Sequence, residues 1–460
     1  MNLILFSAIW GVGMMLGGLF IKNRSAAKNM ALLGALLLTS GNLLELNGFA
    51  VFKSDFNGML DYNRFGLLYL TVLSVALIFY FLLSGKEIEA VGKHPFEYFA
   101  LLFFVMSGVG LVALFNNLLV LFLGIEIISI PLYILTGSDK RNLKSNEAAL
   151  KYFLMGAFST GIFLLGIAFL YGGSGSFRLQ DLMLQQGDQY IVLLLIGVVL
   201  LLISLSFKVS AAPFHFWTPD VYDGAPTVFT SFMATIVKAA FFIGFLKVFS
   251  GAFSGLSENW RPSFTIIIVL TLLIGNITAV YQQSVKRMLA YSSIAQAGFM
   301  LFSVYASNDL AEQSLLLYAA AYCLSTIGLF AVLIKMNDYT FEGFNGLAKK
   351  EPLLAFVASV CVFSLAGIPL TAGFFAKFYV LSAAMKSGAN LWLVIFAVIM
   401  AAVSVYYYFR IIAAMYFKEG GEQVLVTTPV YKWALMLVVV LILLLGVIPE
   451  SALLNWLVLY

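Results

Sequence analysis

The chain has 460 residues, of which 62% are hydrophobic and only 10% charged, and its formal net charge is +4. Soluble domains carry roughly 25% charged residues, so this composition excludes a soluble globular protein and indicates an integral membrane protein. The two cysteines, Cys323 and Cys361, are too few for a disulfide framework or for an iron–sulfur cluster with cysteine ligands.

Apolar segments long enough to cross about 30 Å of hydrocarbon follow one another along the chain. The first begins without a basic leader region, which is typical of a retained helix rather than of a cleaved signal peptide. The connecting segments lack the alternating pattern of strands, so we expect an all-α polytopic membrane protein. Fourteen membrane-spanning helices are predicted, at residues 2–21, 29–46, 65–84, 96–114, 116–137, 148–171, 190–212, 226–249, 263–281, 287–305, 311–335, 353–386, 391–416 and 432–457.

Basic residues are distributed unevenly between the two sides that this topology defines. The loops after odd-numbered helices hold sixteen lysines and arginines, and the opposite side holds six. Because basic residues collect in cytoplasmic loops, the asymmetry supports fourteen helices and predicts that both termini lie outside. Four lysines belong to neither side, since they fall within predicted spans: Lys151, Lys208, Lys238 and Lys377.

Two ionisable residues lie near the middle of predicted spans. Lys238 is twelve residues past Pro226 and eleven before Phe249, and Glu126 is ten residues in from Asn116. A lysine at that depth costs roughly 2.5 to 3.5 kcal/mol on insertion scales, so it normally faces the interior of the bundle and a partner or water. The alternative for these two residues is a purely structural buried ion pair.

Lys151 and Lys208 each have a second interpretation. Lys151 lies only a few residues inside its helix, and Lys208 follows a long apolar run. Either ammonium can therefore belong to a helix-end lysine that extends to the membrane interface.

Two predicted spans are interrupted next to a lysine. In FKVSAAPFHFW, Pro213 follows Lys208, whereas in SLAGIPLTAGFFAKFY the lysine, Lys377, follows Gly367, Pro369 and Gly373. Proline removes a backbone donor and frees carbonyls in mid-membrane, which survive only where protein or a water-filled cavity satisfies them. The rest of the first stretch, WTPDVYDGAPT, is predicted to be a turn at the cytoplasmic edge, with Asp220 and Asp223 as loop caps and surface contacts.

Two broken helices in corresponding halves are typical of an inverted-repeat transporter with sites near the midplane. We therefore expect a single membrane domain over residues 1–460. Its predicted parts are three N-terminal helices (1–84), two five-helix repeats (96–249 and 263–416) and a C-terminal helix (432–460).

Several long motifs, in order, resemble one known family. These are FKVSAAPFHFWTPDVYDGAPT at 207–227, TIVKAAFF around Lys238, VKRMLAYSSIAQAG at 285–298 and GIPLTAGFFAKF at 367–378. They resemble the antiporter-like membrane subunits of respiratory complex I, the proton-pumping NADH:quinone oxidoreductase. WTPDVYDGAPT and a lysine rather than a glutamate at 377 resemble the N-subunit branch of that family. The resemblance covers essentially the whole chain.

The resemblance implies a role in a proton path for each ionisable residue. Glu126 matches the glutamate of the family's fifth helix, Lys208 the lysine of the broken seventh helix paired with it, and Lys238 the central lysine of the eighth. Lys377 matches the lysine of the broken twelfth helix, and His215 the histidine after the first break, which bridges two parts of the path. Lys151 matches a sixth-helix lysine of less defined role.

Lysine suits such a path because burial favours its neutral form and a nearby carboxylate favours its charged form. Our hypothesis is that a proton from the cytoplasm reaches Lys208 and Lys238 through waters and then moves laterally to Lys377. Separation of the Glu126–Lys208 pair, driven by neighbouring subunits, would force the transfer. Arginine cannot replace these lysines, because it stays protonated.

Motifs for redox cofactors are absent from the sequence. There is no GxGxxG, no Walker loop and no CxxC, and the only histidines, His94 and His215, lie outside the centres of spans. We therefore expect no cofactor and no metal in this chain. NADH, FMN, iron–sulfur clusters and quinone are expected in partner subunits.

The expected partners are other membrane-arm subunits, the lipid bilayer and protons, with no nucleic acid, and the expected location is the bacterial inner membrane. Two alternative functions share this fold and its lysines. One is a Na⁺/H⁺ antiporter subunit of the related multisubunit antiporters, and the other is the pumping subunit of a membrane hydrogenase or of a ferredoxin-driven relative.

Overall fold

The computed structural model describes residues 1–21, 23–52, 57–184, 191–420 and 424–448. The chain divides into two compact units, Met1–Thr271 and Leu272–Tyr460, and the division falls inside helix α12 (Ser257–Val280). Over the described ranges the regular structure is helical, with only isolated β-bridges between loops. Within the described residues, thirteen helical segments are long and apolar enough to cross a membrane, so the predicted all-α membrane class is confirmed.

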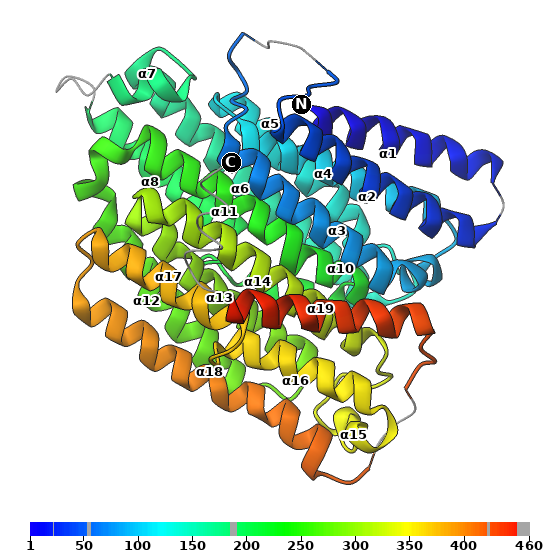
Figure 1. Cartoon of the computed structure of the whole chain (residues 1–460). Helices are drawn as coiled ribbons and strands as arrows, with labels where there is room; N and C mark the ends of the chain where they lie inside the picture. Colours follow the sequence, from blue (N-terminus) through cyan, green and yellow to red (C-terminus); the bar gives the residue numbers. More distant parts are fainter. Residues whose placement is uncertain (22, 53–56, 185–190, 421–423, 449–460) are drawn as a thin grey trace. The chain divides into compact units, whose positions relative to one another are not determined.

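The first unit begins with long helices that match the predicted spans, although several ends differ by a few residues. For example, Asn142 accepts a hydrogen bond from the backbone N–H of Lys144 and caps a helix that starts before residue 148. The long helices are α1 (Asn2–Phe20), α2 (Arg24–Leu46), α3 (Arg64–Val91), α4 (Pro95–Leu114), α5 (Leu118–Thr136), α6 (Leu143–Ser174) and α8 (Ile191–Lys208). Helix α1 packs against α2 and α4, and α6 packs against α8 (Figure 1).

Shorter elements complete the first unit: α7 (Leu179–Leu184), α9 (Trp217–Gly224), α10 (Thr227–Phe232) and α11 (Lys238–Leu246). Two π-helical turns, Met233–Val237 and Lys247–Ala252, flank α11, and together these pieces form one span, Thr227–Ala252. This span is the predicted eighth helix, and its π-helical turns leave no signal in the apolar pattern of the sequence.

The second unit contains α13 (Val285–Ala306), α14 (Asp309–Ile334), α15 (Leu347–Lys350), α16 (Pro352–Ala366), α17 (Ala372–Lys386), α18 (Leu391–Phe417) and α19 (Pro429–Val447). Helix α18 runs beside α16 (Figure 1), and α14 packs against both α16 and α17. The predicted span 353–386 is the α16–α17 pair, broken at 367–371. Each half has 15 residues, too few to cross alone, so the pair together accounts for this twelfth predicted span.

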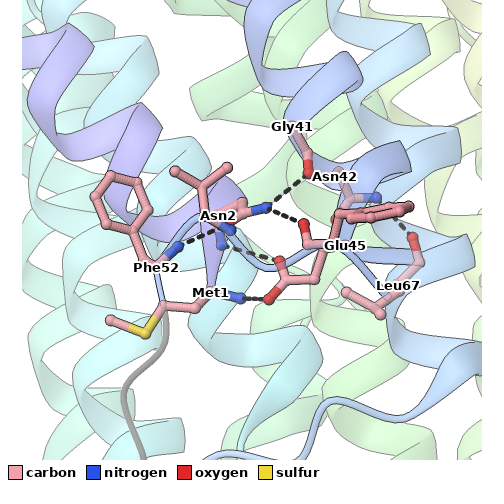
Figure 2. A network of polar contacts seen from close by, with 9 residues as sticks. Met1, Asn2, Gly41, Asn42, Glu45, Phe52 and Leu67 are labelled. Carbon is pink, nitrogen blue, oxygen red and sulfur yellow. Dashed lines mark hydrogen bonds and ion pairs between the residues drawn. The ribbon is translucent and has the colours of Figure 1, made fainter. Parts of the chain in front are cut away.

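A polar network joins α1, α2 and the segment after α2 (Figure 2). The Asn2 side chain donates to the Gly41 carbonyl at 3.0 Å and accepts from the backbone N–H groups of Val51 and Phe52 at 3.0 and 3.2 Å. The Met1 amino group forms an ion pair with the buried Glu45 carboxylate. Since every partner comes from one of two neighbouring segments, the network fixes α1 against α2.

The structure differs from the predictions at two helix ends and at one predicted turn. Helix α8 ends at Lys208 rather than at residue 212, and α19 ends at Val447, whereas the rest of the predicted span to residue 457 lies largely outside the described residues. WTPDVYDG, predicted as a turn, is helix α9. Its Pro219 lies in the first turn, where a helix needs no backbone donor, and Asp220 there complements the helix dipole. The inverted symmetry of the two repeats stays a prediction.

Candidate functional site

The first break begins where α8 ends at Lys208. Ser210 adopts a left-handed conformation with φ of 65°. Its N–H donates to the Phe207 carbonyl at 3.0 Å, and the next N–H, of Ala211, donates to the Ser206 carbonyl at 2.8 Å. This pattern is a Schellman motif, which stops a helix and satisfies its last carbonyls. Lys208 is consequently the last helical residue, and its cation lies in the last turn, where the helix dipole favours positive charge.

The side chain of Trp217, the first residue of α9, holds the break closed. Its indole N–H donates to the Phe207 carbonyl at 3.1 Å, and its ring stacks on Tyr152 of α6 with centroids 4.8 Å apart. The indole therefore joins α9 to the end of α8 and to α6.

We expect Trp217→Phe to destabilise the protein by about 2 kcal/mol or more, because phenylalanine keeps a ring beside Tyr152 but loses the N–H donor and leaves part of the buried indole volume empty. Thermal unfolding of the purified protein measures this difference. An unchanged midpoint would mean that the bond to Phe207 contributes nothing to stability.

Lys208 and Glu126 are each hydrogen-bonded to a hydroxyl group of α5 or α6. The Lys208 ammonium is only 7% exposed and donates to the hydroxyl of Ser129 at 3.0 Å, one turn along α5 from Glu126. The Glu126 carboxylate accepts a hydrogen bond from Thr160 of α6 at 2.7 Å and attracts the Lys208 ammonium through space. Ser129 donates its own hydrogen to the Ile125 carbonyl at 2.8 Å, so the ammonium and the carboxylate have separate hydrogen-bond partners and interact with each other through space.

Lys151 lies apart from this cluster, on the surface of α6. Its ammonium is bonded to Glu147 at 2.7 Å and to Asp220 of α9 at 3.0 Å, and its side chain is 42% exposed. Asp220 therefore makes the surface contact that the sequence suggested, but from a helix rather than from a turn.

Lys238 is the most deeply buried of the four lysines, with 1% of its surface exposed. It follows the π-helical turn Met233–Val237, and its ammonium lies 5.8 Å from the centre of the Tyr222 ring of α9. Tyr69 of α3 donates to the neighbouring carbonyl of Ala239 at 2.8 Å. Helical turns of the π type occur frequently at functional sites, because they alter the backbone hydrogen-bond ladder locally.

His215 lies in the segment between α8 and α9. Its ring is buried and packs against Phe216 with centroids 4.5 Å apart. Burial lowers the pKa of the imidazole below its usual value, and a hydrogen bond with the Pro213 backbone opposes that shift. The ring is therefore neutral at pH 7, a state in which it has one donor and one acceptor nitrogen.

The second break repeats the backbone pattern of the first. Gly367 is left-handed with φ of 84°, its N–H donates to the Ser364 carbonyl, and the N–H of Ile368 donates to the Phe363 carbonyl, both at 3.0 Å. In this motif Leu365 occupies the position that Lys208 has in the first break.

Lys377, on α17, returns to the end of α16. Its ammonium donates to the carbonyls of Leu365 and Ala366, each at 2.9 Å, and lies 4.8 Å from the centre of the Phe299 ring. These carbonyls lie at the negative end of the α16 dipole, so the break itself provides the counter-charge. In both halves a buried ammonium thus lies at the C-terminus of a broken helix, although the two lysines differ in sequence position.

The sequence identified the lysines but not the groups that hold them. Ser129 accepts a hydrogen bond from Lys208, and Thr160 donates one to Glu126. The Tyr222 ring lies near the Lys238 ammonium, and the Gln296 amide donates to the Leu365 carbonyl that Lys377 also bonds. A serine three residues from a membrane glutamate is a detectable signal, whereas Thr160 required the packing of α6 on α5. Within the part of the chain that the structure describes, no three His, Cys, Asp or Glu side chains gather to hold a metal.

Comparison with known proteins gives consistent matches along the chain. A family model described as NADH:quinone oxidoreductase/Mrp antiporter, transmembrane, matches residues 115–404. The NADH-quinone oxidoreductase subunit N of Trichlorobacter lovleyi is 38% identical over 407 residues, which cover 87% of this chain and 83% of the relative. A chain of respiratory complex I from Thermus thermophilus is 32% identical, with a TM-score of 0.84 and 98% of both chains covered. A chain of the Mrp complex from Dietzia sp. has a TM-score of 0.84 at 18% identity, covering 99% of this chain and 95% of that one, which shows a shared fold alone.

Proposed function

Because the chain belongs to the family of NADH:quinone oxidoreductase and Mrp antiporter membrane subunits, we propose that it translocates protons as a membrane subunit of an NADH:quinone oxidoreductase. The observation that carries this proposal is the pair of broken helices, each with a buried lysine ammonium at its C-terminal end. A buried lysine is costly in a membrane, and two whose ammonium groups lie at the C-terminal ends of broken helices favour an ion pathway over a scaffold.

In the proposed path, protons enter from the cytoplasm and pass between lysines. Lys208 takes a proton while Glu126 attracts its ammonium, and releases it when the carboxylate withdraws toward its donor Thr160. Lys238 receives the proton in the centre of the first unit, and Lys377 receives it in the second. His215 bridges two parts of the path, and Lys151 has an auxiliary role at its cytoplasmic edge.

In the proposed function, this subunit is a translocase without redox groups. NADH, FMN, iron–sulfur clusters and quinone bind to partner subunits of the membrane complex. We also propose that it resides in the bacterial inner membrane with both termini outside, as the distribution of basic residues favours.

Purification of the tagged chain from its native membranes tests the proposal. We expect the chain to co-purify with an arm that contains flavin and iron–sulfur clusters and oxidises NADH. Co-purification with hydrogenase activity would assign the chain to the pumping subunits of hydrogenases. Sodium–proton exchange in reconstituted vesicles without any electron-transfer partner would assign it to the cation antiporters. Either result would overturn the proposal.

A further inference from the structure

The carbonyl of Leu365 is bonded by two side chains at once. The Lys377 ammonium donates to it at 2.9 Å, and the amide of Gln296 on α13 donates to it at 2.8 Å. We propose that Gln296 is a positioning residue for Lys377, which keeps this carbonyl satisfied when the lysine amine moves away from it to pass on its proton. The inference rests on the proposed function, in which Lys377 exchanges a proton.

The orientation of the Gln296 amide follows from its partners. A carbonyl only accepts hydrogen bonds, so the atom facing Leu365 must be the NH₂ group, and the amide oxygen faces Tyr318 of α14, whose hydroxyl donates to it. The same NH₂ group donates to the hydroxyl of Tyr408 on α18 at 3.2 Å. The Tyr408 hydroxyl is also hydrogen-bonded to Ser292. Partners on α14, α16 and α18 thus fix the orientation of the Gln296 amide.

The side chains that are hydrogen-bonded around Gln296 are shielded from solvent. Gln296, Tyr318, Tyr408 and Ser292 are all buried. The space between Gln296, Tyr318 and Lys377 is a cavity of about 10 Å³, which is roughly the volume needed by one water. A carbonyl that loses its donor here has little solvent to replace it, and buried acceptors without a partner are unfavourable.

The hydrogen bond from Gln296 determines how easily the Lys377 amine leaves the carbonyls of α16. The Schellman motif satisfies the Phe363 and Ser364 carbonyls, whereas those of Leu365 and Ala366 are bonded by side chains. With Gln296 present, departure of the ammonium leaves Leu365 bonded. Without Gln296, the same departure leaves the carbonyl without a donor, which holds the charged lysine in place and slows proton release.

The test is NADH-driven proton uptake per NADH oxidised, measured in inverted vesicles that contain the assembled complex. We expect Gln296→Met to lower this ratio about tenfold, because the buried Leu365 carbonyl is then left without a donor whenever the Lys377 amine moves away from it. We expect Gln296→His to restore most of it, because a neutral imidazole has one donor for Leu365 and one acceptor for Tyr318. Reduction of ferricyanide by NADH in the same vesicles measures assembly independently of the membrane path.

A matched control is Asn276→Leu. Asn276 is an equally buried amide of the same unit, bonded to Tyr407 at 3.1 Å and to the Leu272 carbonyl at 2.8 Å rather than to Leu365. An equal loss in this variant, or no recovery with Gln296→His, would reduce Gln296 to a structural residue. If Gln296→Met does not assemble, Tyr318→Phe, which removes only the hydroxyl that orients the amide, must itself lower the ratio.

Lys377→Met separates this inference from the function on which it rests. Normal uptake in Lys377→Met would overturn the proposed path and the role of Gln296 with it. Reduced uptake in Lys377→Met together with normal uptake in Gln296→Met would overturn the role of Gln296 alone.

Discussion

Replacing Lys238 with methionine is expected to abolish coupled proton uptake by inverted vesicles while NADH still reduces ferricyanide at its normal rate. Methionine has nearly the length of lysine and suits a site with 1% exposure, so the variant removes the proton carrier without opening a cavity. Positioned groups that transfer protons contribute about 10²–10⁴-fold to the rate, so transfer through this chain should slow by about a hundredfold or more. Fluorescence quenching of a pH-sensitive dye measures the uptake.

Two further variants decide whether the effect concerns the proton or the charge. Lys238→Arg keeps a positive charge but cannot release its proton, and it should fail as completely as methionine. Lys247→Met removes a lysine from the same span, nine residues further along, where it pairs with Asp61 at 3.3 Å, and it should pump normally. Full uptake in Lys238→Met, or equal failure in Lys247→Met, would remove Lys238 from the path.

The helices could be predicted because the bilayer imposes a length on them. Apolar runs of about 20 residues identify spans directly, and thirteen predicted spans are single continuous helices or helical pieces of the expected length. Pro369 and its neighbouring glycines also identified the remaining span, 353–386, as a broken one. The prediction failed at α9, because Pro219, Asp220 and Gly224 are turn-forming residues that also suit the two ends of a short helix.

The candidate site was predictable in its charges and not in its geometry. Membrane depth made Lys238 and Glu126 conspicuous, since a buried charge is costly wherever its partner lies. The equivalence of the two breaks was hidden, because one lysine precedes the break and the other follows it. Only the backbone shows that Leu365 occupies the position of Lys208 and that the Lys377 ammonium returns to it.

That return depends on the close approach of α17 to α16. The backbone N–H of Gly373 donates to the hydroxyl of Ser364 at 3.2 Å, and Ser325 of α14 donates to the same oxygen at 2.8 Å. Lys377 follows Gly373 by one helical turn, which brings its ammonium to the last carbonyls of α16. A residue with no side chain at 373 is therefore part of the lysine site, although it carries no functional group.

We expect Gly373→Ala to be the most damaging small substitution in the second unit. A Cβ at this position would lie 1.8 Å from the Ser364 carbonyl oxygen, a backbone atom that cannot rotate aside. Separating α17 from α16 should cost about 3 kcal/mol or more, at the upper end of what overpacking costs, and would draw Lys377 away from Leu365. Both the midpoint of thermal inactivation and the proton uptake per NADH should fall. The control is Gly161→Ala on α6, where a Cβ meets nothing within 4 Å, so proton uptake should stay unchanged and the midpoint should stay the same or rise slightly, because alanine favours the helix. A variant at 373 with the parent's midpoint would show that the two half-helices separate without cost, so that their contact does not hold Lys377.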